Sequence, residues 1–395
     1  MERDIAEALA RGDRDRMLEL CDAVLLQWPD DRRALWNAAV IRAERGEIEA
    51  AAEHYARIDA IESGGVQTAR ALRTAFMNPE KAARKEPYVA VLENVAVDTS
   101  HWSVVCGDRL FSQETHARSV SASPFVRGRV SPDGERCVMT LPREPPRIEQ
   151  ACILLGSDAN YAHWVLRNLL KLSLLESAAV PPSAHYVVRQ DLRPWQQEYL
   201  ELLGIREERL LRVPEGRILA FRTLFVPVNL LNHPRIADGV AWLRSRVAPH
   251  LASAQDADDQ LLVSRREHDQ RRLLNEPDLE AALKPLGFRT IVPGRMSVRD
   301  QIAAFSRARV VVAAHGAALA NMVFAPRTAS LVEISSVNIA GMGEIRYLCH
   351  AVGQRVSTVV STDVETSPVS GGRLKMHRDY RVDIDEVMSA VAALL

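Results

Sequence analysis

The chain has 395 residues, of which 47% are apolar and 26% are charged, as in ordinary soluble globular proteins. Its formal net charge of −1 argues against a general nucleic-acid binder and against a protein held on a membrane by charge. The five cysteines lack the spacing of a zinc or redox site. With no signal peptide after Met1 and no apolar run long enough to span a bilayer, we expect a cytoplasmic chain of two or three domains.

Residues 1–78 are predicted to be helical. Apolar residues fall at helical spacing before the turn at Trp28–Asp31 and again on both sides of a turn at Gly46. Small residues and the late aromatic Tyr55 make the segment similar to a tetratricopeptide repeat. Because fewer than three copies are present, we expect the segment to pack on the next domain, and we consider it a docking site for a protein partner.

Residues 86–252 and 253–395 are predicted to be two further domains. Pro79 and the charged residues after it mark the first boundary, and a polar segment from Ser253 marks the second. The region 88–141 reads as short β-strands, and beyond it strands alternate with helices. This alternation favours an α/β architecture.

The last of these domains is predicted to be a Rossmann-like half. The apolar run Val310–Ala314 is typical of a parallel strand buried on both faces. Parallel strands joined by helices form right-handed crossovers. Strands are expected at residues 260–264, 289–292, 309–313 and 330–334.

The segment Ala313–Asn321, with the sequence AAHGAALAN, lies where a buried strand turns into a helix. In open α/β sheets, ligands bind at such carboxyl ends of strands. Gly316 would let a ligand approach the backbone, the helix start would favour an anion, and His315 would donate a hydrogen bond to a phosphate or sugar oxygen. Tight helix–sheet packing with a satisfied histidine is the alternative.

The segment Ser264–Glu276 also follows a predicted strand and precedes a helix. Four arginines within eight positions at a strand end would neutralise a diphosphate. The alternative is a solvated loop in which Asn275 acts only as a helix N-cap. Two such strand ends in one sheet favour a shared anionic ligand.

The segment Asn160–Trp164, with the sequence NYAHW, opens a predicted helix in the preceding domain. His163 and Arg167 are four residues apart and therefore share one face of that helix. We expect this face to point into a cleft between domains. The alternative is an aromatic helix core in which His163 is hydrogen-bonded.

Taken in order, these three segments resemble glycosyltransferase family 61. The family pattern has an Asn-Tyr-x-His-Trp helix, a Ser-Arg-Arg strand end with a downstream Arg-x-Leu-x-Asn-Glu, a His-Gly-Ala-x-Leu-x-Asn turn and a Val/Leu-Glu-Ile/Leu strand. In this chain they are residues 160–164, 264–266, 271–276, 315–321 and 332–334. The resemblance covers roughly residues 88–360. Ala162 stands where members commonly carry a bulkier residue, which we expect to alter the acceptor pocket.

The resemblance implies a GT-B-like fold, with two Rossmann-like domains facing a cleft. It implies inverting, metal-independent transfer of a sugar from a nucleotide diphosphate donor, a UDP-sugar, to a glycan or glycolipid acceptor in bacterial surface polysaccharide synthesis. No cofactor and no nucleic-acid partner are expected, and association with the inner face of the membrane would be peripheral at most. Asp383-Ile384-Asp385 looks like the metal site of some glycosyltransferases, but Asp383 and Glu386 form the pattern of a helix cap. Gly341-Met342-Gly343 is interpreted as a loop.

His163 is the expected general base, because an unperturbed histidine has a pKa of about 6.5 and the base should come from the half opposite the donor. Asp158 and Glu114 are carboxylate alternatives. The expected donor-binding residues are Ser264, Arg265, Arg271, Asn275, His315, Gly316, Ala317, Ala318, Asn321 and Glu333. The expected acceptor or cleft residues are Asn160, Tyr161, Trp164 and Arg167. A non-catalytic nucleotide-binding or scaffold protein that uses the helical repeat is the alternative function, against which the presence of all three segments argues.

Overall fold

The structure of the chain is a computed structural model, and it describes residues 8, 11–111, 123–127, 135–252, 259–364 and 375–395. The chain divides into two compact units. Unit 1 comprises Met1–Gly156, Ser177–Asp191 and Glu208–Asn229, and unit 2 comprises Ser157–Glu176, Leu192–Glu207 and Leu230–Leu395. Within the described residues, no helix has the length and apolar character needed to cross a bilayer.

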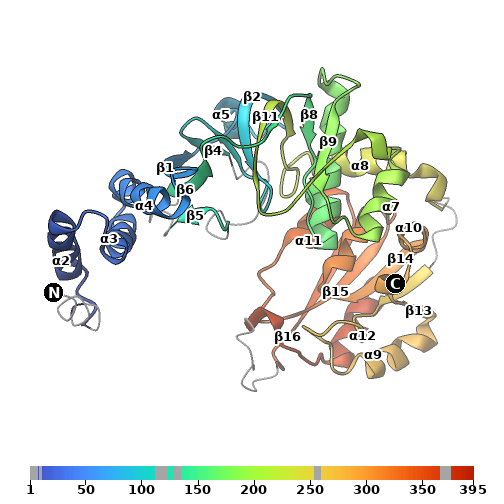
Figure 1. Cartoon of the computed structure of the whole chain (residues 1–395). Coiled ribbons are helices and arrows are strands. Elements are labelled where there is room, and N and C mark those ends of the chain that lie inside the picture. The colour runs from blue at the N-terminus through green and yellow to red at the C-terminus, as the bar shows by residue number, and fades with distance from the viewer. Residues whose placement is uncertain (1–7, 9–10, 112–122, 128–134, 253–258, 365–374) are drawn as a thin grey trace. The chain divides into compact units, whose positions relative to one another are not determined.

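The described part of unit 1 begins with the helices α2 (Arg14–Gln27), α3 (Arg32–Glu44) and α4 (Ile48–Ser63), drawn in blue in Figure 1. The Asp31 carboxylate caps α3 by accepting a hydrogen bond from Ala34 N at 2.8 Å. Tyr55 of α4 is fully buried and packs in one cluster with Ala69 and Val138 of the neighbouring sheet. The helical segment therefore packs on the following strands, as expected from its small number of repeats.

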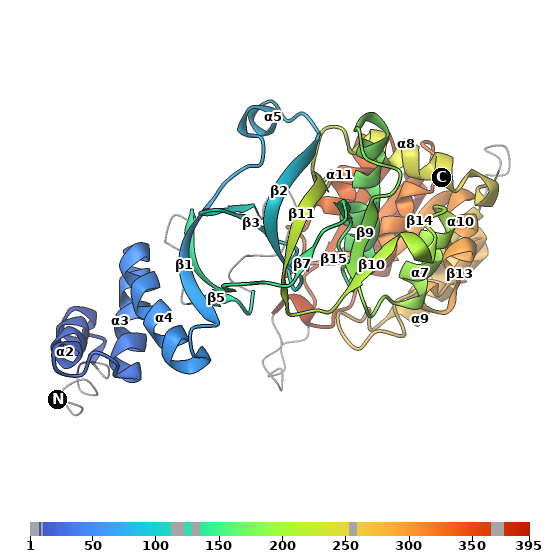
Figure 2. The ribbon, with the colours of Figure 1, turned by 45° about the horizontal axis from the view of Figure 1, so that its top comes forward.

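The helices end earlier than the sequence predicted, because Gln67–Thr74 form strand β1. This strand pairs along most of its length with β6 (Arg136–Pro142), and Figure 2 shows it beside α4. Ala69 and Ala71 pack toward the helices, whereas Leu72 lies in a second cluster. Each face of β1 buries one residue, Ala69 on one face and Leu72 on the other. The strand therefore lacks the two-residue alternation of a half-buried strand, and the Ala69–Leu72 spacing fits a helix instead.

Among the described residues of unit 1, the strands form one mixed sheet in the order β10-β9-β8-β11-β2-β3-β4-β1-β6-β5, with β7 beside β11. The strands β8, β9 and β10 are parallel, but β2 runs antiparallel to β11 and to β3. Unit 1 thus differs from the all-parallel sheet expected of a Rossmann-like half. The remaining bounds are β2 (Val89–Asp98), β3 (Val104–Cys106), β4 (Arg109–Phe111), β5 (Val126–Arg127), β7 (Arg147–Ile148), β8 (Cys152–Leu154), β9 (His185–Arg189), β10 (Leu210–Val213), β11 (Ile218–Pro227) and the short helix α5 (Pro79–Ala83).

Unit 2 contains a parallel sheet whose described strands follow the order β13-β12-β14-β15-β16. Four of these strands lie within two residues of the positions expected from the sequence. Numbered along the chain from one to five, their order is 2-1-3-4-5, a doubly wound arrangement. The bounds are β12 (Asp259–Val263), β13 (Phe288–Ile291), β14 (Ala308–Ala314), β15 (Ser330–Ser336) and β16 (Arg355–Ser361).

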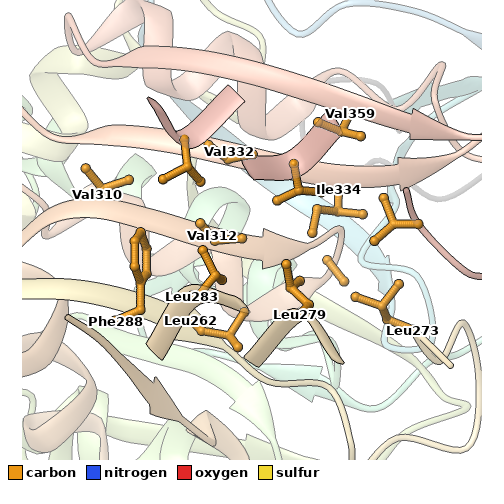
Figure 3. Close-up of a cluster of buried hydrophobic side chains, with 14 of the residues drawn as sticks. Leu262, Leu273, Leu279, Leu283, Phe288, Val310, Val312, Val332, Ile334 and Val359 are labelled. Atoms are coloured by element: carbon orange, nitrogen blue, oxygen red, sulfur yellow. The ribbon is translucent and has the colours of Figure 1, made fainter. Parts of the chain in front are cut away.

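One face of this sheet is covered by the helices α9 and α12. Val310, Val312 and Val332 lie in one buried cluster with Leu279 and Leu283 of α9, as Figure 3 shows. The described helices and turns of unit 2 are α6 (Tyr161–His163), η2 (Trp164–Leu169), η3 (Leu170–Ser177), α7 (Pro194–Leu202), α8 (Ile236–Arg246), η5 (Ala248–His250), α9 (Glu276–Leu283), η7 (Lys284–Leu286), η8 (Pro293–Arg295), α10 (Val298–Ser306), η9 (Ala317–Val323), α11 (Glu344–Ala351), η10 (Lys375–His377) and α12 (Ile384–Ala392). The short turn η4 (Glu207–Arg209) begins at the last residue of a unit 2 segment and continues into unit 1.

The expected domain 86–252 is divided between the two units. Its strands belong to unit 1, whereas α6, α7 and α8 belong to unit 2. The Glu198 carboxylate of α7 accepts a hydrogen bond from Val298 N at 2.8 Å, and Arg244 of α8 donates to Ala325 O at 3.0 Å. The order of elements along the chain does not predict these contacts with the C-terminal half. The polar residues 253–258, expected at the domain boundary, lie outside the described residues.

Candidate functional site

Two predicted segments follow neighbouring strands of the parallel sheet in unit 2. Ser264 comes directly after β12, and His315 comes directly after β14. The chain order reverses between these two strands, because β13 lies on the other side of β12. In doubly wound sheets, ligands bind in the crevice outside the carboxyl ends of strands at such a switch point.

Gly316 lies beneath the side chain of Arg265. A Cβ atom added to Gly316 would stand 1.9 Å from Arg265 Nη1, so the guanidinium occupies the space that any other residue would fill. The backbone of Gly316 is extended, with φ of −176°, a conformation that any residue can adopt. Glycine is therefore needed here for the close approach of Arg265 and not for the backbone conformation. The predicted closeness of the two strand ends is therefore present in unit 2.

Arg265 and Arg271 form a local excess of positive charge. Arg265 is only 8% exposed, and burial, followed by repulsion from Arg271, lowers the pKa of its guanidinium to about 10. Burial also lowers the pKa of Arg271, whose φ of 54° is uncommon for a residue with a side chain. An anion beside both groups would relieve this repulsion.

Ser264 and Glu276 brace the loop that carries Arg265. The buried Glu276 carboxylate accepts hydrogen bonds from Arg265 N at 3.0 Å and from the Ser264 hydroxyl. Ser264 Oγ in turn accepts from Arg266 Nε at 2.8 Å. The predicted donor residue Ser264 therefore shapes the loop through its hydroxyl.

Asn275 was also predicted to bind the donor, but its side chain is used elsewhere. Its amide nitrogen donates to Val382 O at 2.8 Å, and its amide oxygen accepts from Val382 N at 3.0 Å. It makes no side-chain capping bond to α9. Asn275 thus joins the end of the Ser264–Glu276 loop to the segment at Val382, and it lines neither of the two cavities described below.

The first cavity, called the apolar cavity here, has a volume of about 370 Å³. Its walls combine the aromatic rings of Tyr161 and Trp195, whose centroids are 5.3 Å apart, with the loop after β13. The lining residues are Tyr161, Trp195, Val263, Ser264, Arg265, Glu267, His268, Val292, Pro293, Gly294, Met296, Gln301, Ala314, Gly316, Ala317, Ala318 and Leu319. This size and lining are typical of a site for a planar, mainly apolar group.

The second cavity, called the polar cavity, has a volume of about 730 Å³. It shares Gly316 and Ala317 with the apolar cavity, so the two meet at the end of β14. Its lining residues are Asn160, Ala162, His163, Arg167, Asn232, Arg271, His315, Gly316, Ala317, Gly341, Met342, Gly343, Glu344, Ile345, Met376 and His377. All of them, and all residues of the apolar cavity, belong to unit 2.

His163 is held by a buried carboxylate. Its Nδ1 lies 3.0 Å from Asp158 Oδ2, and Asp158 is 3% exposed. Asn160 caps the turn by accepting from Ala162 N at 2.9 Å and from His163 N at 3.3 Å. The expected base was assigned to the half opposite the expected donor segments, but α6 and both strand-end segments lie in the same unit.

His315 is held in a similar way by Glu333. Its Nδ1 lies 2.7 Å from Glu333 Oε1, and Glu333 Oε2 accepts from Arg346 Nη1 at 3.0 Å. Glu333 is fully buried and lines neither cavity, so it orients His315 from behind. Two histidines, each with Nδ1 on a buried carboxylate, therefore open onto the polar cavity.

The remaining predicted residues of α6 have different surroundings. Arg167 lines the polar cavity with His163, as their spacing predicted, and its Nη2 lies 3.0 Å from Glu344 Oε1. Trp164 is fully buried against Trp195 and lines neither cavity. Tyr161 faces the apolar cavity and donates to the fully buried Asn321 at 2.7 Å. Asn321 therefore stands behind the site.

Sequence reasoning missed Trp195, Gln301 and Arg346. No local pattern marks them, because Trp195 and Gln301 reach the apolar cavity, and Arg346 reaches Glu333, from helices distant in sequence. The loop at Gly341–Gly343 was recognised as a loop, but not as a wall of the polar cavity. Asp158 was considered only as a rival base, although its position five residues before His163 in a turn is the available signal. The other rival, Glu114, lies outside the described residues.

The Asp383 carboxylate accepts from Asp385 N at 2.9 Å and from Glu386 N at 3.2 Å, which confirms the expected helix cap.

Residues 161–332 match the model of the family described as Glycosyltransferase 61. A comparison with curated proteins gives no match. The matched segment includes His163, Arg265 and His315, so these residues belong to a glycosyltransferase family 61 domain and the protein is a glycosyltransferase.

Proposed function

We propose that the protein transfers a sugar, with inversion, from a UDP-sugar to a glycan or glycolipid acceptor, using cationic side chains rather than a metal. The observation that carries this proposal is the meeting of two cavities at Gly316 and Ala317, beside the charges of Arg265 and Arg271. The nucleoside would occupy the apolar cavity, the diphosphate the shared wall, and the sugar the polar cavity.

Inversion requires a group that takes the acceptor proton as the acceptor oxygen attacks the anomeric carbon. The new carbon–oxygen bond forms while the bond from that carbon to the diphosphate oxygen breaks, and its electron pair leaves with the phosphate. With Nδ1 of His163 donating to Asp158, Nε2 is left to take the proton. Arg265 and Arg271 would stabilise the departing charge.

The wider setting of the proposal comes from the family resemblance. The doubly wound order of unit 2 supports its use as the donor half of a GT-B-like enzyme, with acceptor binding assigned to unit 1. We propose a cytoplasmic role in bacterial surface polysaccharide synthesis, near the inner face of the membrane. The tetratricopeptide-like helices α2–α4 would then bind a protein partner rather than the donor, because they line neither cavity.

Arg271→Ala tests the position of the diphosphate. A charge-assisted hydrogen bond contributes about 1.5–3 kcal/mol, so UDP affinity should fall by about tenfold or more. Titration calorimetry with UDP measures this directly. Arg289→Ala is the matched control, because Arg289 pairs with Asp259 and lines neither cavity. Unchanged affinity in Arg271→Ala and in Arg265→Ala would remove the diphosphate from this wall.

A further inference from the structure

A chain of hydrogen bonds passes behind the two cavities of unit 2. The Gln301 amide nitrogen donates to Pro293 O at 3.1 Å and to Met296 O at 3.3 Å. Both carbonyls belong to the loop that walls the apolar cavity. Gln301 Oε1 accepts from Asn321 Nδ2 at 2.9 Å, and Asn321 Oδ1 accepts from the Tyr161 hydroxyl at 2.7 Å.

The direction of every bond in this chain is fixed. Because Asn321 uses its amide nitrogen on Gln301, its oxygen must accept, and the Tyr161 hydroxyl must donate to it. Tyr161 can then only accept in its 2.8 Å contact with the Tyr199 hydroxyl. Asn321 and Tyr199 are fully buried, and a buried polar group without its partner is costly. The hydrogen-bond chain therefore favours this one arrangement of donors and acceptors.

The chain reaches both cavities through a single helical turn. Tyr161 begins α6 and faces the apolar cavity, whereas His163 ends α6 and faces the polar cavity. The π-helical segment η2 follows directly, and such segments occur frequently at functional sites. A shift of Tyr161 relative to the loop at Pro293 would therefore also move His163.

We infer that Tyr161 is a positioning residue that links the Pro293–Met296 loop of the apolar cavity to His163. Building on the proposed function, a nucleotide in the apolar cavity would press on both ends of the chain, the Pro293–Met296 loop and the Tyr161 ring. The chain would then hold the turn that carries His163 at the reacting atoms. Tyr161 does this through Asn321 and Gln301, without touching the transferred sugar.

Hydrogen exchange of the α6 and η2 backbone amides, with and without UDP, tests the link. UDP should slow exchange across residues 162–169 in the wild type. Tyr161→Phe and Gln301→Met cut the chain at opposite ends, and each should lose this protection while UDP still binds. Tyr199→Phe is the matched control, because it removes one buried hydroxyl but leaves the bond from Tyr161 to Asn321. It should keep the protection.

The second measurement is the rate of sugar transfer from a UDP-sugar, or the rate at which water hydrolyses the UDP-sugar. Tyr161→Phe should lower kcat by about a hundredfold with donor KM near normal, as expected for a displaced reacting group. Tyr199→Phe should keep kcat close to wild type even if its Tm falls equally. Equal loss of protection and of kcat in both tyrosine variants, or loss in neither, would overturn the inference. Absence of UDP binding to the wild type would instead contradict the proposed function.

Discussion

Gly316 shows how a single residue records the geometry of the site. Its backbone is extended, so other residues could adopt the same conformation, but Arg265 Nη1 fills the space of the missing side chain. Arg265 itself is fixed through its backbone by Glu276 and through Nη2 by Gln270 O at 3.2 Å. The position of the guanidinium thus depends on the smallness of the residue beneath it.

Gly316→Ala should weaken UDP binding by about tenfold while the fold persists. The added methyl group would collide with the end of a flexible side chain, so Arg265 would move away from the shared wall. Gly341→Ala is the control for UDP affinity, because Gly341 lines only the polar cavity proposed for the sugar and an added Cβ there meets nothing within 4 Å. Calorimetry with UDP and a thermal melt separate loss of binding from loss of folding. Wild-type affinity in Gly316→Ala would show that the diphosphate does not need Arg265 in this position.

His163→Ala should lower turnover by roughly 10²–10⁴-fold, the usual contribution of a general base. UDP affinity should stay nearly unchanged, because Arg265 and Arg271 carry the diphosphate. Asp158→Asn should also lower turnover, because an amide in place of the carboxylate no longer stabilises protonated His163. The exposed His350 supplies the control substitution. Near-normal turnover of His163→Ala would reject the base assignment, and a lost UDP affinity would move His163 to the donor site.

The helical segment at residues 161–177 buries a lysine side chain, which lowers the stability of the fold near neutral pH. Lys171 is 1% exposed in η3, and burial lowers its pKa to about 7. An unfolded lysine has a pKa of about 10.4, so between about pH 7 and 10 the unfolded chain binds a proton that the folded chain does not. The stability of the fold therefore rises with pH across this window, and at pH 7 Lys171 destabilises it by on the order of 4 kcal/mol.

Lys171→Met should accordingly raise the free energy of unfolding at pH 7.5 by a few kcal/mol, about the cost just described. The advantage should shrink at pH 9.5, where more of the unfolded lysine is neutral. Urea unfolding at both pH values measures the difference. Lys284→Met, at an exposed position in η7, should show no such pH dependence. A gain that is equal at both pH values would mean that burial of charge is not its origin.

Elements with strong local patterns could be predicted from the sequence. Four of the five described strands in the parallel sheet of unit 2, and the adjacency of the Ser264 and His315 segments, followed from apolar runs and from the rules of parallel sheets. Strand β1 could not, because burial on both faces removes the alternating pattern. The roles of Asn275, Asn321 and Glu333 could not either, since the partners of their side chains, such as Val382, are tertiary contacts.

At the scale of the whole molecule, the chain order of the middle region misled the domain assignment. Strands and helices that alternate from residue 151 onward belong to different units. Hydrophobic periodicity identifies each element, but it does not reveal which sheet a helix covers. The consequence is functional, because the proposed base and the proposed diphosphate contacts lie in one unit.

Turnover should survive chelation. In the proposed mechanism, the departing diphosphate meets Arg265 and Arg271, and preorganised cations can stabilise that charge as a metal would. The Asp-x-Asp pattern at Asp383 is engaged in capping α12. Initial rates measured in excess EDTA should therefore match those without it, while a manganese-dependent glycosyltransferase assayed in the same buffer loses activity. Arg271→Ala should remain impaired when manganese is added, because the missing charge belongs to the protein. Complete loss of turnover in EDTA, restored by manganese, would contradict the cationic mechanism and require a metal at the shared wall.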